Sequence, residues 1–268
     1  SLNYSLHYFL ITLQIRYNPS HIFNWKVTLN NFLERTHILV GDEGLEKLKQ
    51  ANVLIAGLGG VGSYVVEALA RSGVGKLTII DNDTVNQSNI NRQLPALNST
   101  IGKPKTTVIE HRIKDINPEC ELTVINDFLR AENISDYLQA QQYDYIADCI
   151  DSLNSKVGLI ETAYNLDLNV ISSMGAGGKL DPTRIEVTDL FKTHECPLAK
   201  MMRSRLRRRG IKKGIKAVFS SEIPQKPLPP EPTDTGRPRS VVGSISFIPS
   251  IFGLTMAGVI INDILKAE

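Results

Sequence analysis

The chain has 268 residues, a length that favours one enlarged domain, or a domain with an appendage, over two full-sized domains. Hydrophobic residues make up 42% and charged residues 22% of the sequence, which excludes a wholly disordered or collagen-like chain. Thirty Lys and Arg residues against 28 Asp and Glu give a formal net charge of +2, so the overall charge alone does not indicate a nucleic-acid partner.

The cysteine count limits the chemistry further. Cys120, Cys149 and Cys196 contain no Cys-x-x-Cys pair, which excludes a disulfide framework and a four-cysteine zinc site. We therefore expect no structural zinc. Free thiols are typical of a reducing compartment, so a cytoplasmic location is expected.

The first 30 residues contain Arg16 and Lys26 but no acidic residue, and they are interpreted as an irregular extension. No charged region precedes the apolar residues 8–13, so a secretory signal is not expected. An organellar presequence is a less favoured alternative, because two basic residues are too few for its Arg-rich pattern.

From residue 31 the pattern becomes regular, and spaced leucines predict one or two short helices up to residue 48. Short apolar runs then alternate with segments of helical spacing, which predicts an α/β fold with a doubly wound, mostly parallel Rossmann-like sheet. Strands are expected at 51–57, 76–81, 121–125, 143–148 and 169–173, and helices at 65–71, 103–117, 135–141 and 155–165.

Beyond Gly175 the alternation ends, and strands are predicted at 184–188 and 217–220. A proline-rich segment, 224–238, is interpreted as a surface loop. The chain closes with a predicted strand at 244–249 and an apolar helix at 252–265; a membrane span is the less favoured alternative, because polar residues interrupt the run. The expected organisation is an extension at 1–30, a nucleotide-binding domain at 31–175, and a substrate region at 176–268 that completes the same fold.

A glycine-rich loop, Gly57-Leu58-Gly59-Gly60-Val61-Gly62, follows the first strand and opens a helix. In this context backbone N–H groups approach a phosphate at the positive end of the helix. Asp81 ends the next strand, where a carboxylate accepts hydrogen bonds from ribose hydroxyls. Gly57, Gly59, Gly60, Gly62 and Asp81 are therefore predicted to bind a nucleotide, although they do not choose between NAD and ATP.

The polar string after Asp81 favours a polyphosphate over a nicotinamide ring. Arg92 has a planar fork that binds phosphate oxygens, and its neighbours are neutral donors. The predicted nucleotide-contacting residues of this string are Asp83, Asn89, Asn91, Arg92 and Gln93.

Two further charges complete the predicted site. Lys105 supplies a positive charge at a helix start, and Asp151 follows the fourth strand, where a carboxylate beside ATP phosphates usually binds magnesium. Each of these residues also has a structural alternative: a turn cap for Asn91 or Gln93, a solvated helix position for Lys105, and a helix N-cap for Asp151.

These motifs, in this order, resemble those of the ubiquitin-activating-enzyme-like adenylyltransferase superfamily, which includes the ThiF, MoeB and HesA proteins. The resemblance implies that ATP and Mg²⁺ activate a carboxylate as an acyl-adenylate. It also implies catalytic roles for Arg92, Lys105 and Asp151. Arg35 falls where an arginine of this superfamily reaches into the partner subunit's site, which implies a homodimer.

Within the superfamily, residues 32–265 are most similar to the branch that dehydrates threonylcarbamoyladenosine in tRNA. Its motifs include Gly175-Ala176-Gly177-Gly178, Asp181-Pro182-Thr183, Phe219-Ser220-Ser221-Glu222 and 243–250. The implied reaction adenylates the threonyl carboxylate, and the carbamoyl group then displaces AMP to form a ring. Sulfur-transfer or cysteine-desulfurase proteins are further expected partners.

The segment 203–213 holds seven basic residues without an acid between them, which favours contact with the tRNA backbone over a merely solvated helix face. They are Arg203, Arg205, Arg207, Arg208, Arg209, Lys212 and Lys213. Nearby Cys196 is interpreted as a bystander, because the cyclisation needs no thiol; activating enzymes that form thioesters place a cysteine in a comparable region.

Three other functions stay open from the sequence. The first is adenylation of the C-terminal carboxylate of a sulfur-carrier or ubiquitin-like protein, although the missing cysteine pairs argue against its zinc-bearing members. The second is an NAD-dependent oxidoreductase, which Arg92, Lys105 and Asp151 disfavour. The third is a non-catalytic nucleotide-binding or RNA-binding protein that has kept the fold.

Overall fold

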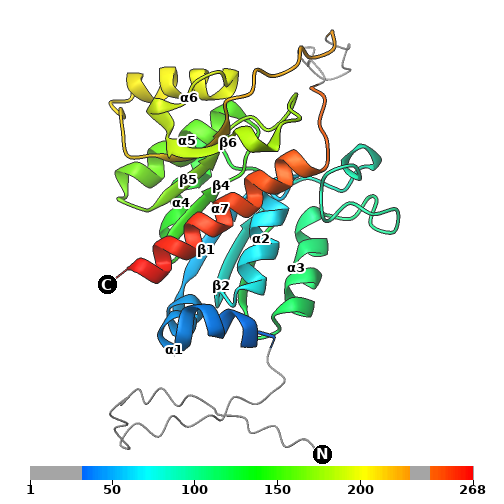
Figure 1. Ribbon diagram of the computed structural model, residues 1–268, viewed down its shortest axis with the longest axis vertical. Helices are drawn as coiled ribbons and strands as arrows, with labels where there is room; N and C mark the ends of the chain where they lie inside the picture. The colour runs from blue at the N-terminus through cyan, green and yellow to red at the C-terminus, as the bar shows by residue number, and fades with distance from the viewer. Residues whose placement is uncertain (1–31, 230–241, 268) are drawn as a thin grey trace, which may run out of the picture.

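The computed structural model describes residues 32–229 and 242–267, so the predicted extension at 1–30 and most of the proline-rich segment lie outside the described residues. One seven-stranded sheet, in the order β3-β2-β1-β4-β5-β7-β6, forms the centre of the molecule (Figure 1). All neighbouring strands are parallel except β6 and β7, which are antiparallel. The predicted doubly wound, mostly parallel α/β fold is confirmed.

The strands lie close to their predicted positions. They are β1 Asn52–Ala56, β2 Lys76–Ile80, β3 Glu121–Ile125, β4 Tyr145–Asp148, β5 Val170–Ser173, β6 Ile185–Asp189 and β7 Lys216–Ser220. The central strands β1, β4 and β5 are buried along their whole length, as expected for apolar strands with helices on both faces. After β3 the chain returns to the other side of β1, which makes β1 and β4 the switch point where such sheets bind ligands.

Helices cover both faces of the sheet. One apolar core joins the first face to α1 Glu34–Gln50, α2 Gly62–Arg71, α3 Lys105–Ile116 and α7 Phe247–Lys266. A second core joins the other face to α4 Ala131–Gln139, α5 Leu153–Asn165 and α6 Pro197–Arg208. Figure 1 shows α7 crossing in front of the sheet beside α2, whereas α5 and α6 lie at the far end of the molecule from α1.

The first helical region, α1, is kinked at Gly41. Gly41 adopts a φ of 69°, in the left-handed region that favours glycine, so α1 consists of two short helices joined at this residue. This agrees with the prediction of one or two short helices before the first strand.

The predicted strand at 244–249 is wrong. Residues 242–246 form no regular element, and α7 begins at Phe247. The alternation of serine and apolar residues imitates a strand, but Pro249 lies in the first helical turn, where no intrahelical N–H donor is needed. The helical conformation is favoured over the strand because the helix packs closely on the start of α2. A Cβ on Gly253 would lie 2.3 Å from the Val61 carbonyl oxygen.

Among the described residues, α7 is the one helix long and apolar enough to span a membrane by composition. Its buried side chains, among them Phe252, Met256 and Ile260, pack in the same core as α2 and the sheet. At its end Asp263 accepts a hydrogen bond of 2.7 Å from the Tyr145 hydroxyl. In this structure α7 is therefore a core helix of the α/β fold.

Candidate functional site

An open cleft of about 1390 Å³ runs along the carboxyl ends of the parallel strands. Ligand sites for drug-sized molecules usually measure about 300–1,000 Å³, so this cleft has room for more than a nucleotide. The predicted site residues that line it are Gly57, Gly59, Gly60, Asp81, Asp83, Asn89, Arg92, Gln93, Lys105 and Asp151.

The glycine loop joins β1 to the start of α2 at one end of the cleft. Gly57 has a φ of 91°, and its N–H donates to the Ile80 carbonyl at 2.8 Å, which fixes the turn against β2. Gly62 does not line the cleft; it lies beneath the loop, where a Cβ would come within 1.7 Å of the Gly57 oxygen. The two glycines therefore have different physical roles: one permits the backbone conformation and the other permits close packing.

Asp81 braces this loop. Its carboxylate accepts a hydrogen bond from the Leu58 N–H at 2.6 Å and another from the Asp83 N–H at 2.8 Å. Burial raises the pKa of Asp81 above its usual value, although the nearby Lys105 ammonium and these two N–H donors oppose the shift. Asp81, which is predicted to bind ribose, thus holds the glycine loop against the end of β2.

The polar string between β2 and α3 is fixed by its own side chains. The Arg92 guanidinium donates to the Ser88 carbonyl at 3.0 Å and to the Asn91 side-chain oxygen at 2.9 Å. Asn91 lies outside the cleft lining, and its amide donates to the Ser244 carbonyl at 3.0 Å, which ties the string to the segment before α7. A contact of Asn91 with the nucleotide stays a prediction.

Gln93 and Asn89 differ in how their side chains are satisfied. Gln93 is 8% exposed, and its side-chain oxygen has no hydrogen-bond partner within the described residues. Because buried polar atoms are normally paired, this oxygen is available to a donor from a ligand in the cleft. The Asn89 side-chain oxygen instead accepts from the Asn86 N–H at 3.0 Å and shapes the turn.

Lys105 and Asp151 lie on opposite sides of the switch point. Lys105, the first residue of α3, is 4% exposed, and its ammonium contacts the Asp83 carboxylate at 2.7 Å. Asp151 follows β4 and is exposed to the cleft. The cleft thus carries a cation held at a fixed position and an accessible carboxylate.

Arg35 and the basic residues of 203–213 do not line the cleft. Arg35 is exposed on α1, at the other end of the molecule from α6 (Figure 1). Four of the seven basic residues contact other parts of the protein. Arg203 donates to the Thr193 hydroxyl, and Arg205 donates to the Asn154 side chain. Arg207 lies over the Phe191 ring, and Arg209 pairs with Glu161. The other three, Arg208, Lys212 and Lys213, are exposed on the surface.

Several cleft residues were not predicted from the sequence. Asp127 and Phe128 follow β3 and line the cleft, as their place after a parallel strand indicates. Lys179 is 3% exposed and donates to the Ser220 carbonyl at 2.9 Å; burial lowers its pKa, although Cys196 and Glu222 oppose the shift. Cys196 is buried in the same wall, and no local sequence pattern indicates that it lies close to Lys179.

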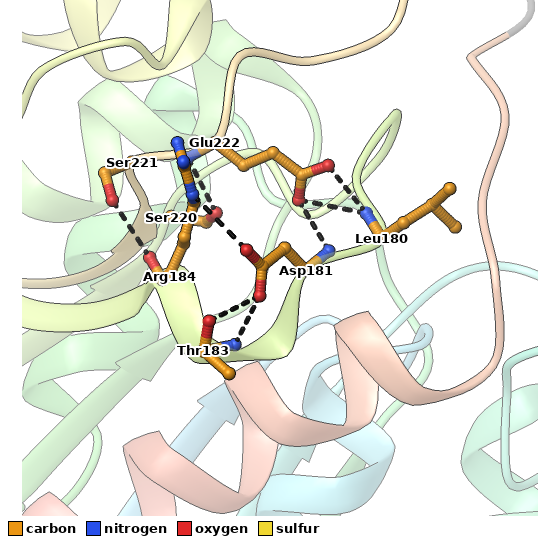
Figure 2. A network of polar contacts seen from close by, with 7 residues as sticks. All are labelled: Leu180, Asp181, Thr183, Arg184, Ser220, Ser221 and Glu222. Carbon is orange, nitrogen blue, oxygen red and sulfur yellow. Dashed lines mark hydrogen bonds and ion pairs between the residues drawn. The ribbon is translucent and has the colours of Figure 1, made fainter.

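The motifs Asp181-Pro182-Thr183 and Phe219-Ser220-Ser221-Glu222, from distant parts of the chain, meet beside Lys179. Figure 2 shows the Glu222 carboxylate facing the backbone of Leu180 and Asp181, whose N–H groups donate at 3.0 and 2.8 Å. The Asp181 carboxylate in turn accepts from Thr183 and pairs with Arg184. These motifs therefore join the turn before β6 to the residues after β7, and the structure gives them a supporting position.

A glycine loop at the start of α2, an acid at the end of β2 and a cleft at the switch point define a nucleotide-binding protein of the doubly wound α/β class. The chain belongs to the ThiF family, whose model matches residues 33–268. This confirms the resemblance to adenylyltransferases predicted from the motifs.

Curated relatives and solved structures narrow the comparison. The chain is 41% identical to the tRNA threonylcarbamoyladenosine dehydratase of Bacillus subtilis, over 87% of this chain and 94% of that protein. It is 44% identical to the Haemophilus influenzae protein of the same name, over 84% and 90%. A crystal structure of the Escherichia coli tRNA N6-threonylcarbamoyladenosine dehydratase in complex with ATP is 36% identical, covers 86% of this chain and 92% of that chain, and superimposes with a TM-score of 0.78.

Proposed function

We propose that the protein is an ATP-dependent dehydratase that closes the threonylcarbamoyl group of a modified tRNA adenosine into a ring. The observation that carries this proposal is that one cleft joins the glycine loop, Arg92, Lys105 and Asp151 at the switch point. Relatives named tRNA threonylcarbamoyladenosine dehydratase match the chain over most of both lengths. The crystal structure of the Escherichia coli relative was solved in complex with ATP.

The chemistry requires an activated carboxylate. A threonyl carboxylate oxygen attacks the α-phosphorus of ATP, pyrophosphate leaves, and an acyl-adenylate forms. The carbamoyl group then attacks the activated carbonyl carbon, and AMP leaves with the carboxylate oxygen. One water is lost from the nucleoside in total, and ATP becomes AMP and pyrophosphate.

The residues of the cleft would act through charge and position. Arg92 and Lys105 would neutralise negative charge on the phosphates as pyrophosphate leaves, and the glycine loop would donate backbone N–H groups. Cyclisation is intramolecular, so it needs the substrate to be held in a folded conformation rather than attacked by an enzyme nucleophile.

A magnesium ion fits the proposed arrangement. Asp151 is an exposed carboxylate in the cleft, whereas Asp83 is already paired with Lys105, so Asp151 is the residue that would hold the metal together with phosphate oxygens. When bound, Mg²⁺ supplies further charge neutralisation at the phosphates.

The surface of α6 and the following turn is the proposed tRNA-binding region. Arg208, Lys212 and Lys213 are exposed there, and α6 begins at the wall of the cleft with Pro197 and Leu198. Contacts between these cations and tRNA phosphates would position the substrate without reading its sequence.

We further propose that two copies of the chain complete the active site. Arg35 does not line its own cleft, and its neighbours on α1, Ile38 and Leu39, are 77% and 86% exposed. Two exposed apolar side chains beside a functional arginine are consistent with an interface. Mixing Arg35→Ala with Lys105→Ala should restore activity if Arg35 acts in trans, and two inactive variants that stay inactive together would contradict this arrangement.

The proposed function is tested with tRNA that carries threonylcarbamoyladenosine. We expect ATP-dependent release of AMP and, after digestion, a nucleoside lighter by one water in the mass spectrum. An unchanged nucleoside mass, with AMP formed only when a carrier protein with a C-terminal glycine is added, would favour the alternative function.

A reducing, cytoplasmic location is the setting we propose. A sulfur-transfer or cysteine-desulfurase partner stays a prediction.

A further inference from the structure

An ion pair without solvent contact lies beneath the floor of the cleft. The Lys156 ammonium contacts the Asp148 carboxylate at 2.9 Å, and both side chains are 0% exposed. Asp148 is the last residue of β4, and Lys156 lies in the first turn of α5. The pair therefore spans the turn that leads from the sheet to the helix, and this turn carries Asp151.

All further bonds of the pair hold this turn or its neighbouring strand. The Lys156 ammonium donates to the Ile150 carbonyl at 2.9 Å, and the Ile150 N–H donates to the Asp148 carboxylate at 3.2 Å. The Ser172 hydroxyl on β5 donates to the same carboxylate at 2.6 Å. Both backbone polar groups of Ile150, its N–H and its carbonyl, are therefore bound by the ion pair. Ile150 directly precedes Asp151.

The same turn touches the glycine loop. The Cys149 N–H donates to the Ala56 carbonyl at 2.9 Å, and a Cβ on Gly57 would lie 2.9 Å from the Cys149 oxygen. A Cβ on Gly62 would lie 3.1 Å from the Cys149 Cβ. The phosphate-binding loop and the turn with Asp151 therefore pack directly on each other, and a shift in one displaces the other.

Stability alone does not explain this pair. Two buried charges lose their hydration, and well-packed apolar side chains of similar volume often give an equally stable protein. An ion pair does, however, fix directions that apolar contacts leave free, because its hydrogen bonds end on particular atoms of residues 148 and 150. The geometry is that of a support for a ligand-bearing turn.

We propose that Lys156 and Asp148 are positioning residues that aim the Asp151 carboxylate at the metal-bound phosphates of ATP. The inference rests on the proposed function only for the identity of the nucleotide and the metal. Neither residue contacts the substrate; they act through the backbone of Ile150. Supporting residues of this kind typically change metal affinity by about 10–100-fold when they are replaced.

The test compares wild type with the paired variant Asp148→Asn/Lys156→Gln, which removes both charges and keeps polar side chains. Binding of a non-hydrolysable ATP analogue is measured over a magnesium series, together with kcat, KM and Tm. The variant should need about 10-fold more magnesium for half-maximal binding. It should bind the analogue normally without magnesium, and it should lose kcat more than it raises KM.

Asp263→Asn is the matched control. Asp263 also joins two elements, through the Tyr145 hydroxyl and the Lys216 ammonium, but its contacts do not involve the turn. This variant should lower Tm without changing the magnesium midpoint. If the paired variant does the same, its role is only structural and the proposal is overturned.

Ser172→Ala covers the case in which the paired variant does not fold. It removes one hydrogen bond to Asp148 and leaves the ion pair in place, so it should shift the magnesium midpoint in the same direction by a smaller factor. An unchanged midpoint would overturn the proposal. Since analogue binding needs no tRNA, a failed dehydration assay would reject the proposed function and leave this result standing.

Discussion

The Lys105 ammonium lies 2.7 Å from the Asp83 carboxylate at the edge of the cleft, and the two residues are also joined by a backbone hydrogen bond of 3.0 Å from the Lys105 N–H to the Asp83 carbonyl. The lysine side chain is 5% exposed, whereas that of Asp83 is 60% exposed. Asp83 thus holds Lys105 in one position, so the cation does not have to be ordered when a phosphate arrives.

Replacing Lys105 by alanine should reduce kcat for AMP formation by about 100-fold or more, because one charged donor to the transferring phosphate is removed. Lys103→Ala is the control: Lys103 is an exposed lysine two residues earlier and does not line the cleft. Steady-state rates of AMP release check both variants. Equal rates for Lys105→Ala and wild type would contradict the role assigned to Lys105.

Gly62→Ala should abolish nucleotide binding and destabilise the protein, because its Cβ would meet the Gly57 oxygen at 1.7 Å and neither backbone can move freely. Gly258→Ala in α7 is the matched control, since a Cβ there has nothing within 4 Å and the change should stabilise the fold by about 0.4–1 kcal/mol. Calorimetric titration with ATP and thermal unfolding distinguish the two. A Gly62→Ala protein that binds ATP normally would refute the packing argument.

The parts of the site that could be predicted from the sequence are local. The glycine loop lies between β1 and α2, Asp81 follows β2, and Lys105 begins α3. Each of these elements can be recognised from a short run of consecutive residues. Their meeting at one edge follows from parallel strands, because the carboxyl ends of such strands share an edge.

The parts that could not be predicted depend on contacts between distant segments. The pairing of Lys156 with Asp148 could not be recognised, because a lysine in an amphipathic pattern is usually solvated. The hydrogen bond from the Asn91 amide to the Ser244 carbonyl, in the segment before α7, could not be foreseen either, because it joins residues far apart in the sequence. The prediction of a strand at 244–249 was wrong for a related reason. The serine spacing has the period of a strand, but the close packing of α7 on α2, which the local sequence does not reveal, favours a helix.

The basic surface of α6 gives a prediction that the structure refines. Because Arg209 pairs with Glu161 at 2.7 Å, its reversal would also disturb α5, so Arg208→Glu combined with Lys212→Glu is the cleaner variant. It should weaken tRNA binding and flatten its salt dependence while sparing ATP affinity. Lys49→Glu, an exposed reversal on α1 at the other end of the molecule in Figure 1, should change tRNA affinity less. Equal affinities of all three proteins over a salt series would reject the proposed surface.

Glu67 on α2 connects two helices through arginines. Its carboxylate contacts Arg112 of α3 at 2.5 Å and Arg71 of its own helix at 2.7 Å, and its side chain is 13% exposed. Burial alone would raise the pKa of Glu67, but hydrogen bonds from Arg112 and Arg71 outweigh it and hold the pKa below its usual value.

A carboxylate with a depressed pKa stabilises the fold above its unfolded pKa, near 4.3, and this contribution is lost as the pH falls through the lower folded value. Glu67→Gln should therefore reduce the free energy of unfolding at pH 7 by about 1 kcal/mol, because solvent screens the exposed Arg71 and Arg112 partners, and the difference from wild type should shrink below about pH 4. Glu186→Gln, which changes an exposed carboxylate on the edge strand β6, is the control and should lower the free energy of unfolding at pH 7 by less than Glu67→Gln does. Urea unfolding between pH 7 and 3.5 measures both, and a Glu67→Gln deficit that persists at low pH would show that the side chain acts by packing rather than by charge.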